Sequence, residues 1–216
     1  MSDTIRGAET AGAGSGEVSR FNFAERVVHW VAAVTFVVLL LTGLAFSYPS
    51  LYWMTAILGG GAAARFLHPW IGAVFTLSLL VMVVMWMKDM TLTRRDGEWL
   101  KSMKHYAMHE SEEVPDVGKY NAGQKLFFWF MLATGVLFLA SGVVLWFPES
   151  FPRWLRATSR FVHYVAALGG GLFLVVHIYL GTIALPGTAR GMLFGRVSRA
   201  WAKHHHLLWY RDEAER

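Results

Sequence analysis

The chain contains no cysteine among its 216 residues. Disulfide bonds, thiol catalysis and cysteine-ligated iron–sulfur clusters are therefore excluded for this chain, and any iron–sulfur relay must belong to a partner. Charged residues are also scarce, at 16%, whereas apolar residues make up 55%. This composition is not that of an ordinary soluble domain.

Charge is absent from four long apolar segments, at about 27–46, 66–87, 126–147 and 161–185. Each is long enough for a transmembrane helix, which needs about 18 apolar residues or more. The segments hold no Asp or Glu and no His-Glu-x-x-His motif, which argues against a transporter or an intramembrane zinc enzyme. The sequence predicts an all-α membrane protein built on a four-transmembrane-helix bundle.

The polar parts of the chain divide into tails and loops. Residues 1–19 are rich in Gly, Ala and Ser and lack an apolar run, so we expect a flexible tail and no signal peptide. Residues 20–187 form the predicted membrane domain. Residues 188–216 are predicted to form a cytoplasmic tail with an amphipathic helix lying on the lipid surface.

Basic residues are distributed unevenly between the two sides of the predicted bundle. Of the 20 Lys and Arg residues, 16 lie in the N-terminal segment, the central loop and the C-terminal tail, and four lie in the other two loops. The positive-inside rule then places both termini and the central loop in the cytoplasm. The formal charge of +5 is explained by this topology, so we expect no nucleic-acid partner.

Two histidines, His163 and His177, lie in the fourth apolar segment, 14 residues apart. At about 1.5 Å and 100° per residue, they are about 21 Å apart along a helix and share one face. One lies near each end of the span. This helix therefore offers imidazoles at two membrane depths.

Two further histidines match these depths. His29 begins the first span and His68 the second, so alternating helix direction pairs His29 with His177 and His68 with His163. Two neutral imidazoles without a carboxylate or thiolate suit haem iron better than zinc. The sequence thus predicts two stacked haems, whereas a purely structural anchor would need no intramembrane His. The alternative for each His is interhelical hydrogen bonding, and it is strongest for His29 and His68 near span ends.

Other features leave alternatives open. Gly169–Gly171 lies between the two histidines of the fourth segment and fits either close helix packing or clearance for a porphyrin. Pro69 is expected in the first turn of the second span, where its missing N–H does no harm. The histidines in polar, basic surroundings are expected to face solvent or a partner. These are His105, His109 and His204 to His206.

Four motifs resemble a known family. They are RFN with ERVVHW around His29, RFLHP around His68, DVGKYNAGQK at 116–125 and VSRAWAKHH at 197–205. Together they resemble the cytochrome b (gamma) subunit of membrane-bound respiratory formate dehydrogenase, over about residues 20–211. The histidine pattern alone is also typical of cytochrome b subunits of other membrane oxidoreductases, such as hydrogenases and thiosulfate reductases, and this is the alternative.

The resemblance implies two b-type haems, an inner one held by His29 and His177 and an outer one held by His68 and His163. It implies an iron–sulfur beta subunit and a molybdenum or tungsten alpha subunit as partners, in a bacterial cytoplasmic (inner) membrane. Electrons would pass from formate through these subunits and both haems to a quinone, menaquinone or ubiquinone. The chain itself would anchor the complex and reduce quinone without oxidising formate. A higher oligomer of the heterotrimer is left open.

The resemblance also implies a quinone site at Asn121, Gly123 and Gln124, with His177 alongside. Amides can hydrogen-bond a quinone carbonyl without adding charge, and glycine allows close approach of the backbone. The residues alone favour another interpretation. Asn121 and Gln124 stand where they would cap the third transmembrane helix.

Overall fold

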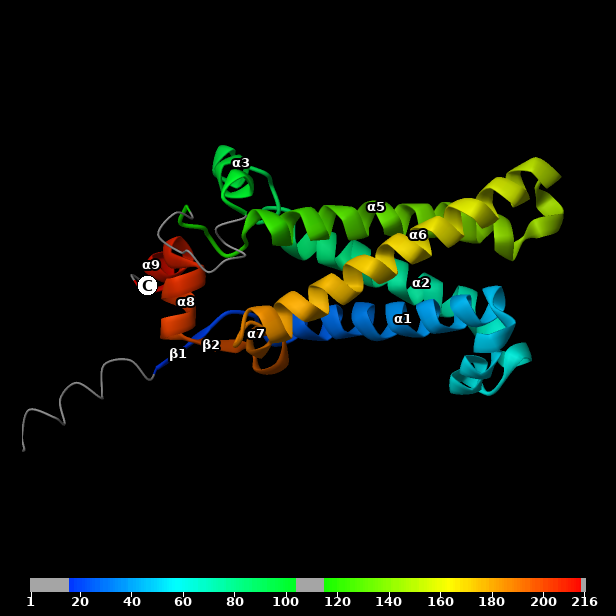
Figure 1. Ribbon diagram of the computed structural model, residues 1–216, viewed down its shortest axis with the longest axis horizontal. Coiled ribbons are helices and arrows are strands. Elements are labelled where there is room, and N and C mark those ends of the chain that lie inside the picture. Colours follow the sequence, from blue (N-terminus) through cyan, green and yellow to red (C-terminus); the bar gives the residue numbers. More distant parts are fainter. Residues whose placement is uncertain (1–15, 104–114, 215–216) are drawn as a thin grey trace, which may run out of the picture. The chain divides into compact units, whose positions relative to one another are not determined.

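The computed structural model describes residues 16–103 and 115–214. Within these ranges, four helices are long and apolar enough to cross a membrane. They are the longest elements in Figure 1: α1 (Phe23–Ser47), α2 (Gly61–Trp86), α5 (Ala122–Trp146) and α6 (Arg153–Tyr179). A π-helical turn at Leu180–Ala184 continues α6. The prediction of an all-α membrane protein with four spans is confirmed.

Each long helix begins four or more residues before the apolar segment that predicted it, because the helix extends past the charged or polar residue that interrupts the apolar run. The largest difference is in α6, which starts at Arg153 and includes an Arg-rich first part. In α2 the early start at Gly61 places Pro69 inside the helix. The expectation that Pro69 lies in the first turn is therefore wrong. The helix continues past Pro69, although the carbonyl of Arg65 loses its usual helical donor there.

Short helices connect the long ones within the membrane unit, which comprises 27–87 and 127–178. A 3-10 helix at Pro49–Leu58 links α1 to α2, and another at Pro148–Ser150 links α5 to α6. Gly59 and Gly60 follow the first of these with φ angles of 86° and 102°, values that glycine adopts without strain. These two glycines therefore form a defined turn between the 3-10 helix and α2.

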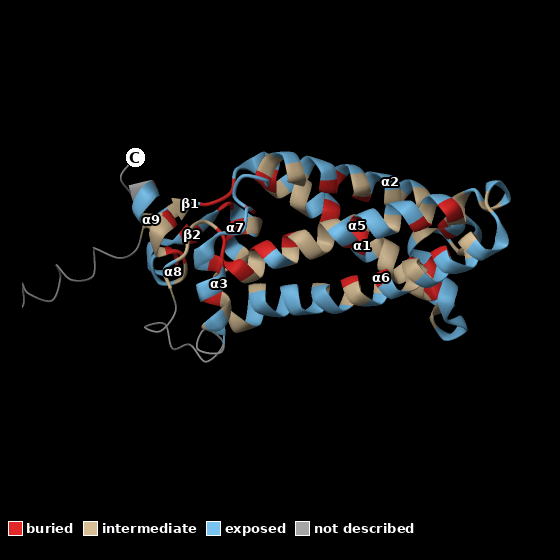
Figure 2. Ribbon diagram, turned by 90° about the horizontal axis from the view of Figure 1, so that it is seen from above, coloured by how far each residue is buried: buried red, intermediate tan, exposed pale blue. Residues whose placement is uncertain are grey.

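The core of the membrane unit is apolar and draws on all four long helices. Phe36 of α1 packs with Phe75 and Leu79 of α2, and Phe138 of α5 and Leu174 of α6 pack against them. At most 28% of the most apolar window of any of the four helices is buried. Figure 2 accordingly shows exposed residues along most of their length. These outward faces are apolar, as helices surrounded by lipid require.

The glycine triplet serves close packing. A Cβ atom at Gly170 would lie 2.9 Å from Cζ of Phe36, and one at Gly171 would lie 3.3 Å from Leu40. Both neighbours belong to α1, so the backbone of α6 approaches α1 more closely than a side chain would allow. Of the two interpretations left open by the sequence, close helix packing is the one these contacts support.

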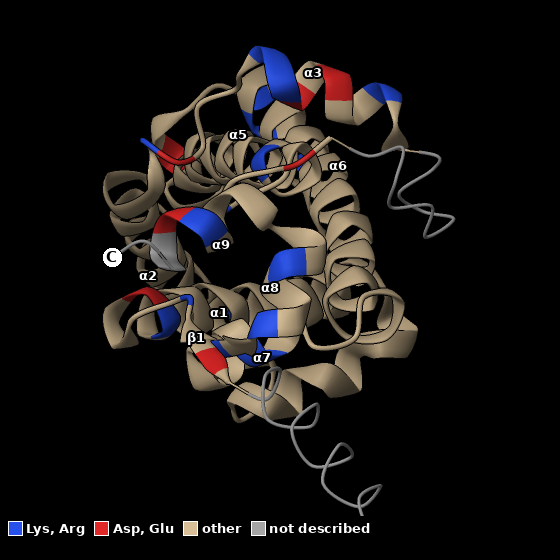
Figure 3. Cartoon of the chain, turned by 90° about the vertical axis from the view of Figure 1, so that its left-hand side faces the viewer, with Lys and Arg blue, Asp and Glu red and all other residues tan. Residues whose placement is uncertain are grey.

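The second unit comprises 1–26, 88–126 and 179–216, of which the structure describes 16–26, 88–103, 115–126 and 179–214. Strands β1 (Glu17–Ser19) and β2 (Arg196–Ser198) pair antiparallel, with Val18 opposite Val197. The short helices are α3 (Arg94–Lys101), α7 (Ala189–Phe194), α8 (Arg199–His205) and α9 (Leu207–Ala214). Their Lys and Arg residues are blue in Figure 3. We call this the polar unit.

The described parts of both predicted tails contain regular structure that the sequence analysis did not expect. The predicted N-terminal tail, 1–19, ends in strand β1, because Val18 pairs with a fully buried Val197. Residues 1–15 lie outside the described ranges. The C-terminal tail forms three short helices and a strand in place of one amphipathic helix. Gly195 ends α7 with a φ angle of 79°, a left-handed conformation that stops a helix.

An aromatic cage around Arg20 forms the centre of the polar unit. The guanidinium lies 4.7 Å from the ring of Trp201 and 5.1 Å from that of Trp209. Arg20 also hydrogen-bonds Nε2 of His206 at 3.1 Å, and Nδ1 of His206 donates to the carbonyl of Gly118 at 2.7 Å. His206 is only 2% exposed. The expectation that it faces solvent or a partner is wrong, whereas His105 and His109 lie outside the described residues.

Candidate functional site

The structure brings together the histidine pairs that the sequence predicts. The ring centres of His29 on α1 and His177 on α6 are 6.2 Å apart. Those of His68 on α2 and His163 on α6 are 6.4 Å apart. The same helix, α6, contributes one imidazole to each pair, because the 14-residue spacing returns to the same helical face.

Both separations suit a single metal ion between two imidazoles. Two metal–nitrogen bonds of about 2 Å each account for about 4 Å of the separation. The remaining distance of roughly 2 Å corresponds to the two gaps between ring nitrogen and ring centre. Among the described residues, no three or more His, Asp or Glu side chains group so that they could hold a metal ion. Each pair could therefore supply the two protein ligands of a haem iron, whereas it lacks the three or four protein ligands of a zinc site.

The His68–His163 pair borders a cavity of about 130 Å³ lined mainly by apolar side chains, including Phe36, Leu40 and Phe138. Two glycines flank the rings. A Cβ atom at Gly43 would lie 3.8 Å from His68, and one at Gly142 would lie 3.6 Å from His163. A Cβ atom at either position would therefore touch the imidazole ring, and glycine keeps side-chain atoms off both rings there.

Each imidazole of this pair also contacts a hydroxyl group. Thr42 Oγ1 on α1 lies 2.7 Å from Nδ1 of His68, and Ser141 Oγ on α5 lies 2.9 Å from Nδ1 of His163. Histidines that bind a metal usually hydrogen-bond through their other ring nitrogen. The sequence analysis missed both hydroxyls. A usable signal existed, since each hydroxyl residue directly precedes one of the two flanking glycines, Gly43 and Gly142.

The His29–His177 pair has different surroundings. The ring of Phe127 stacks on that of His177 with centres 4.5 Å apart and an interplanar angle of 7°. Nδ1 of His29 is buried and has no hydrogen-bond partner in the part of the chain that the structure describes. Among the described residues, this imidazole therefore lacks the hydroxyl contact that Nδ1 of His68 and Nδ1 of His163 each make.

The segment expected to bind quinone begins α5 and belongs to the polar unit. The backbone N–H of Gln124 donates to Oδ1 of Asn121 at 2.9 Å, and the N–H of Asn121 donates to Oε1 of Gln124 at 3.0 Å. This reciprocal pair is a capping box. Asn22 and Glu25 form the same arrangement at the start of α1. Helix capping, the alternative favoured by the residues alone, is therefore what the side-chain oxygens of Asn121 and Gln124 do.

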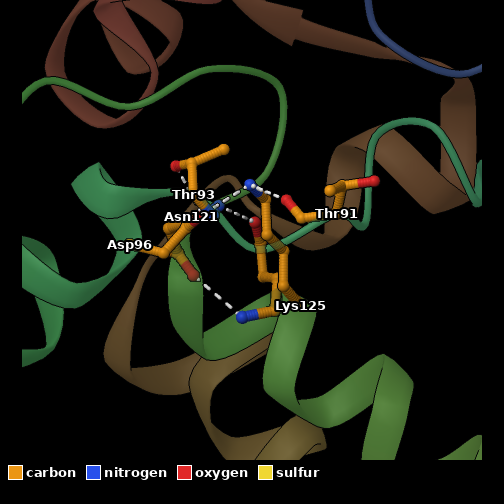
Figure 4. A network of polar contacts seen from close by, with 6 residues as sticks. Thr91, Thr93, Asp96, Asn121 and Lys125 are labelled. Atoms are coloured by element: carbon orange, nitrogen blue, oxygen red, sulfur yellow. Dashed lines mark hydrogen bonds and ion pairs between the residues drawn. The ribbon is translucent and has the colours of Figure 1, made fainter.

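A buried ion pair holds α3 against the start of α5 (Figure 4). Nζ of Lys125 lies 2.9 Å from Oδ2 of Asp96 and donates to the carbonyl of Thr91 at 3.0 Å. The N–H and hydroxyl of Thr93 both donate to the same carboxylate oxygen of Asp96. Beside them, a Cβ atom at Gly123 would lie 3.4 Å from the ring of Trp99 on α3. This network fixes the backbone from which Asn121 and Gln124 project.

The chain is similar to the cytochrome subunits of several formate dehydrogenases. The chain is 36% identical to the formate dehydrogenase cytochrome b556(fdo) subunit of Escherichia coli K12, over 198 residues that cover 90% of this chain and 92% of that protein. It is 33% identical to the nitrate-inducible formate dehydrogenase cytochrome b556(Fdn) subunit of the same strain, covering 90% and 91%. The formate dehydrogenase cytochrome b556 subunit of Haemophilus influenzae is 30% identical, covering 91% and 83%.

A family model also matches most of the chain. It covers residues 20–195, which include the four histidines and all four long helices. The family's cofactor is b-type haem, and the two histidine pairs are of the kind that holds it. The chain is a membrane haem protein for electron transfer, and it belongs to the prokaryotic cytochrome b561 family.

Proposed function

We propose that the chain binds two b-type haems, one between His29 and His177 and one between His68 and His163. The observation that carries this proposal is the near-equal separation of the two cross-helix pairs, 6.2 and 6.4 Å. When bound, haem iron supplies one-electron redox chemistry, and the protein supplies ligation, spacing and electrostatics. The two sites lie about 21 Å apart along α6, so together they span much of the bilayer.

The complex in which this cytochrome works is proposed to be a formate dehydrogenase. The support is the naming of its relatives and the central-loop and C-terminal motifs. In that role the chain anchors an iron–sulfur subunit and a molybdenum or tungsten subunit, and passes their electrons across the membrane to quinone. The alternative is a cytochrome b subunit of another membrane oxidoreductase. Co-purification with a formate-oxidising subunit supports the proposal, and co-purification with a hydrogenase supports the alternative.

The two haems are tested by a pyridine haemochrome spectrum of the complete chain in its complex. We expect two haems b per parent chain and one in each of the variants His163→Ala and His177→Ala. His204→Ala is the matched control, because His204 is an exposed histidine of α8, and it should keep both haems. A folded parent complex with fewer than two haems would refute the proposal.

Quinone is proposed to bind at Asn121, Gly123 and Gln124, on the resemblance of this segment to the formate dehydrogenase family. Since the side-chain oxygens of Asn121 and Gln124 accept backbone hydrogen bonds, their amide N–H groups are the ones suited to donate to a quinone carbonyl. Asn121→Asp and Gln124→Glu keep the capping oxygens and lose these donors.

These two variants separate quinone binding from helix capping. If the amides donate to quinone, each variant raises the KM for a soluble quinone while the haem content and melting temperature stay at parental values. An unchanged KM in both would mean that the segment only caps α5. A melting temperature that falls as the KM rises would also contradict a direct contact between these amides and quinone.

A further inference from the structure

The hydroxyl groups beside the His68–His163 pair have a defined hydrogen-bond direction. Thr42 Oγ1 lies 2.8 Å from the carbonyl oxygen of Val38 as well as 2.7 Å from Nδ1 of His68. A hydroxyl has one proton, and a carbonyl has none to give. The Thr42 proton therefore goes to the helix carbonyl, and Thr42 Oγ1 accepts the proton of His68 Nδ1.

Ser141 repeats this arrangement on another helix. Its Oγ lies 2.5 Å from the carbonyl oxygen of Leu137 and 2.9 Å from Nδ1 of His163. The same count of protons makes Ser141 an acceptor from His163. With the proton on Nδ1, each imidazole of this pair keeps the lone pair of Nε2, the nitrogen that would bind a metal. Thr42 and Ser141 are themselves 0% and 4% exposed, so water does not compete for these bonds.

The other pair lacks this arrangement on at least one side. Nδ1 of His29 is buried without a hydrogen-bond partner among the described residues, and His177 packs its ring face on Phe127. An oxygen that accepts the Nδ1 proton makes the imidazole a stronger electron donor to iron, and hydrogen bonds of this type tune the metal. Stronger donation favours the more highly charged ferric state.

We propose that Thr42 and Ser141 lower the redox potential of the haem at the His68–His163 pair below that of the haem at the His29–His177 pair. The proposal rests on the two-haem function proposed above. With this ordering of potentials, the transfer of one electron, supplied by an iron–sulfur partner, from the His68–His163 site to the His29–His177 site would be favourable. Thr42 and Ser141 are positioning residues, since they act through the imidazoles.

The test is spectroelectrochemistry of the complete complex carrying Thr42→Val or Ser141→Ala. The parent should show two one-electron haem b waves. Each variant should raise the lower wave and leave the higher one in place. A tenfold loss of preference for ferric iron corresponds to a shift of about 59 mV in a one-electron couple.

Matched control variants are available on two of the transmembrane helices, α1 and α2. Within the described residues, the Thr35 hydroxyl bonds only helix carbonyls of α1, and the Ser78 hydroxyl bonds a helix carbonyl of α2, so Thr35→Val and Ser78→Ala remove hydroxyls without a histidine contact. Both should leave the two waves at parental potentials. Thr42→Ser keeps an accepting oxygen and should also keep the parental values, which separates the hydrogen bond from packing.

The outcomes distinguish this proposal from the one it rests on. A parent with fewer than two haems refutes the two-haem function itself. A parent with two haems whose lower wave stays fixed in both variants, or whose higher wave moves instead, refutes the role of Thr42 and Ser141. If Thr42→Val loses a haem, Ser141→Ala decides alone. The ferric electron paramagnetic resonance spectrum of the same samples should change for only one haem.

Discussion

Removal of Lys125 should open helix α3 locally. Lys125→Met keeps the length of the side chain and removes the charge that pairs with Asp96. Lys125 and Asp96 have side chains only 10% and 8% exposed. The variant therefore leaves a buried carboxylate whose remaining hydrogen bonds come from Thr93.

The size of the effect follows from this burial. Breaking a buried ion pair by removing one partner costs about 3–5 kcal/mol. Burial raises the pKa of Asp96, but the hydrogen bonds from Lys125 and Thr93 outweigh it and hold the pKa below its usual value of 3.8. Asp96 is thus ionised at neutral pH, so the full cost applies there. At about 1.4 kcal/mol per factor of ten, the local opening equilibrium of α3 should rise about 100-fold or more.

Hydrogen–deuterium exchange of peptides from α3, read by mass spectrometry, measures this opening directly. The same helix supplies a control. Arg94 and Glu98 form an ion pair with side chains 95% and 50% exposed, so Arg94→Ala should change exchange only slightly, by less than about tenfold. The double variant Lys125→Met with Asp96→Asn should recover much of the loss. Equal exchange in the Lys125→Met and Arg94→Ala variants would refute the reasoning, because burial would then not decide the energy.

Three further predictions concern pH, packing and topology. Burial, and then Arg20, hold the pKa of His206 well below 6.5, so the unfolded chain gains a proton below about pH 6.5 that the folded chain lacks. The melting temperature of the parent should therefore fall as the pH is lowered from 7.5 to 5.5. That of His206→Gln should fall less. Gly170→Ala should lower the free energy of unfolding by about 1–3 kcal/mol, because its Cβ would lie 2.9 Å from Phe36. Gly169→Ala should lower it less, because the nearest atom to its Cβ would lie at 3.6 Å. The temperature at which haem absorbance is lost compares the two variants. Since the chain has no cysteine, single variants Ser150→Cys and Asp212→Cys report topology cleanly. A membrane-impermeant maleimide added to intact cells should label the first only, and labelling of the second would reverse the predicted orientation.

The sequence alone determined the features that depend on composition and regular spacing. Apolar length predicted the four spans, because a bilayer of fixed thickness demands a minimum number of apolar residues. The 14-residue interval put His163 and His177 on one face at two depths, because helix geometry fixes face and depth without reference to other contacts. The alternating direction of the spans then predicted both pairings. The choice between packing and clearance at Gly169–Gly171 stayed open at that level.

Tertiary structure decided the features that depend on which side chain meets which. From the sequence, His206 is expected to be a surface histidine like its neighbours His204 and His205. It is buried instead by contacts with Arg20 and Gly118, which are distant along the chain. Thr42 and Ser141 are ordinary helix residues until α2 and α6 bring an imidazole to each hydroxyl. Local sequence cannot encode such encounters, because the partners lie 26 and 22 residues away and meet only when the bundle packs. Spacing along one helix and the alternating direction of the spans were therefore enough to pair the four histidines, and only the packing of four helices placed a hydroxyl beside His68 and His163.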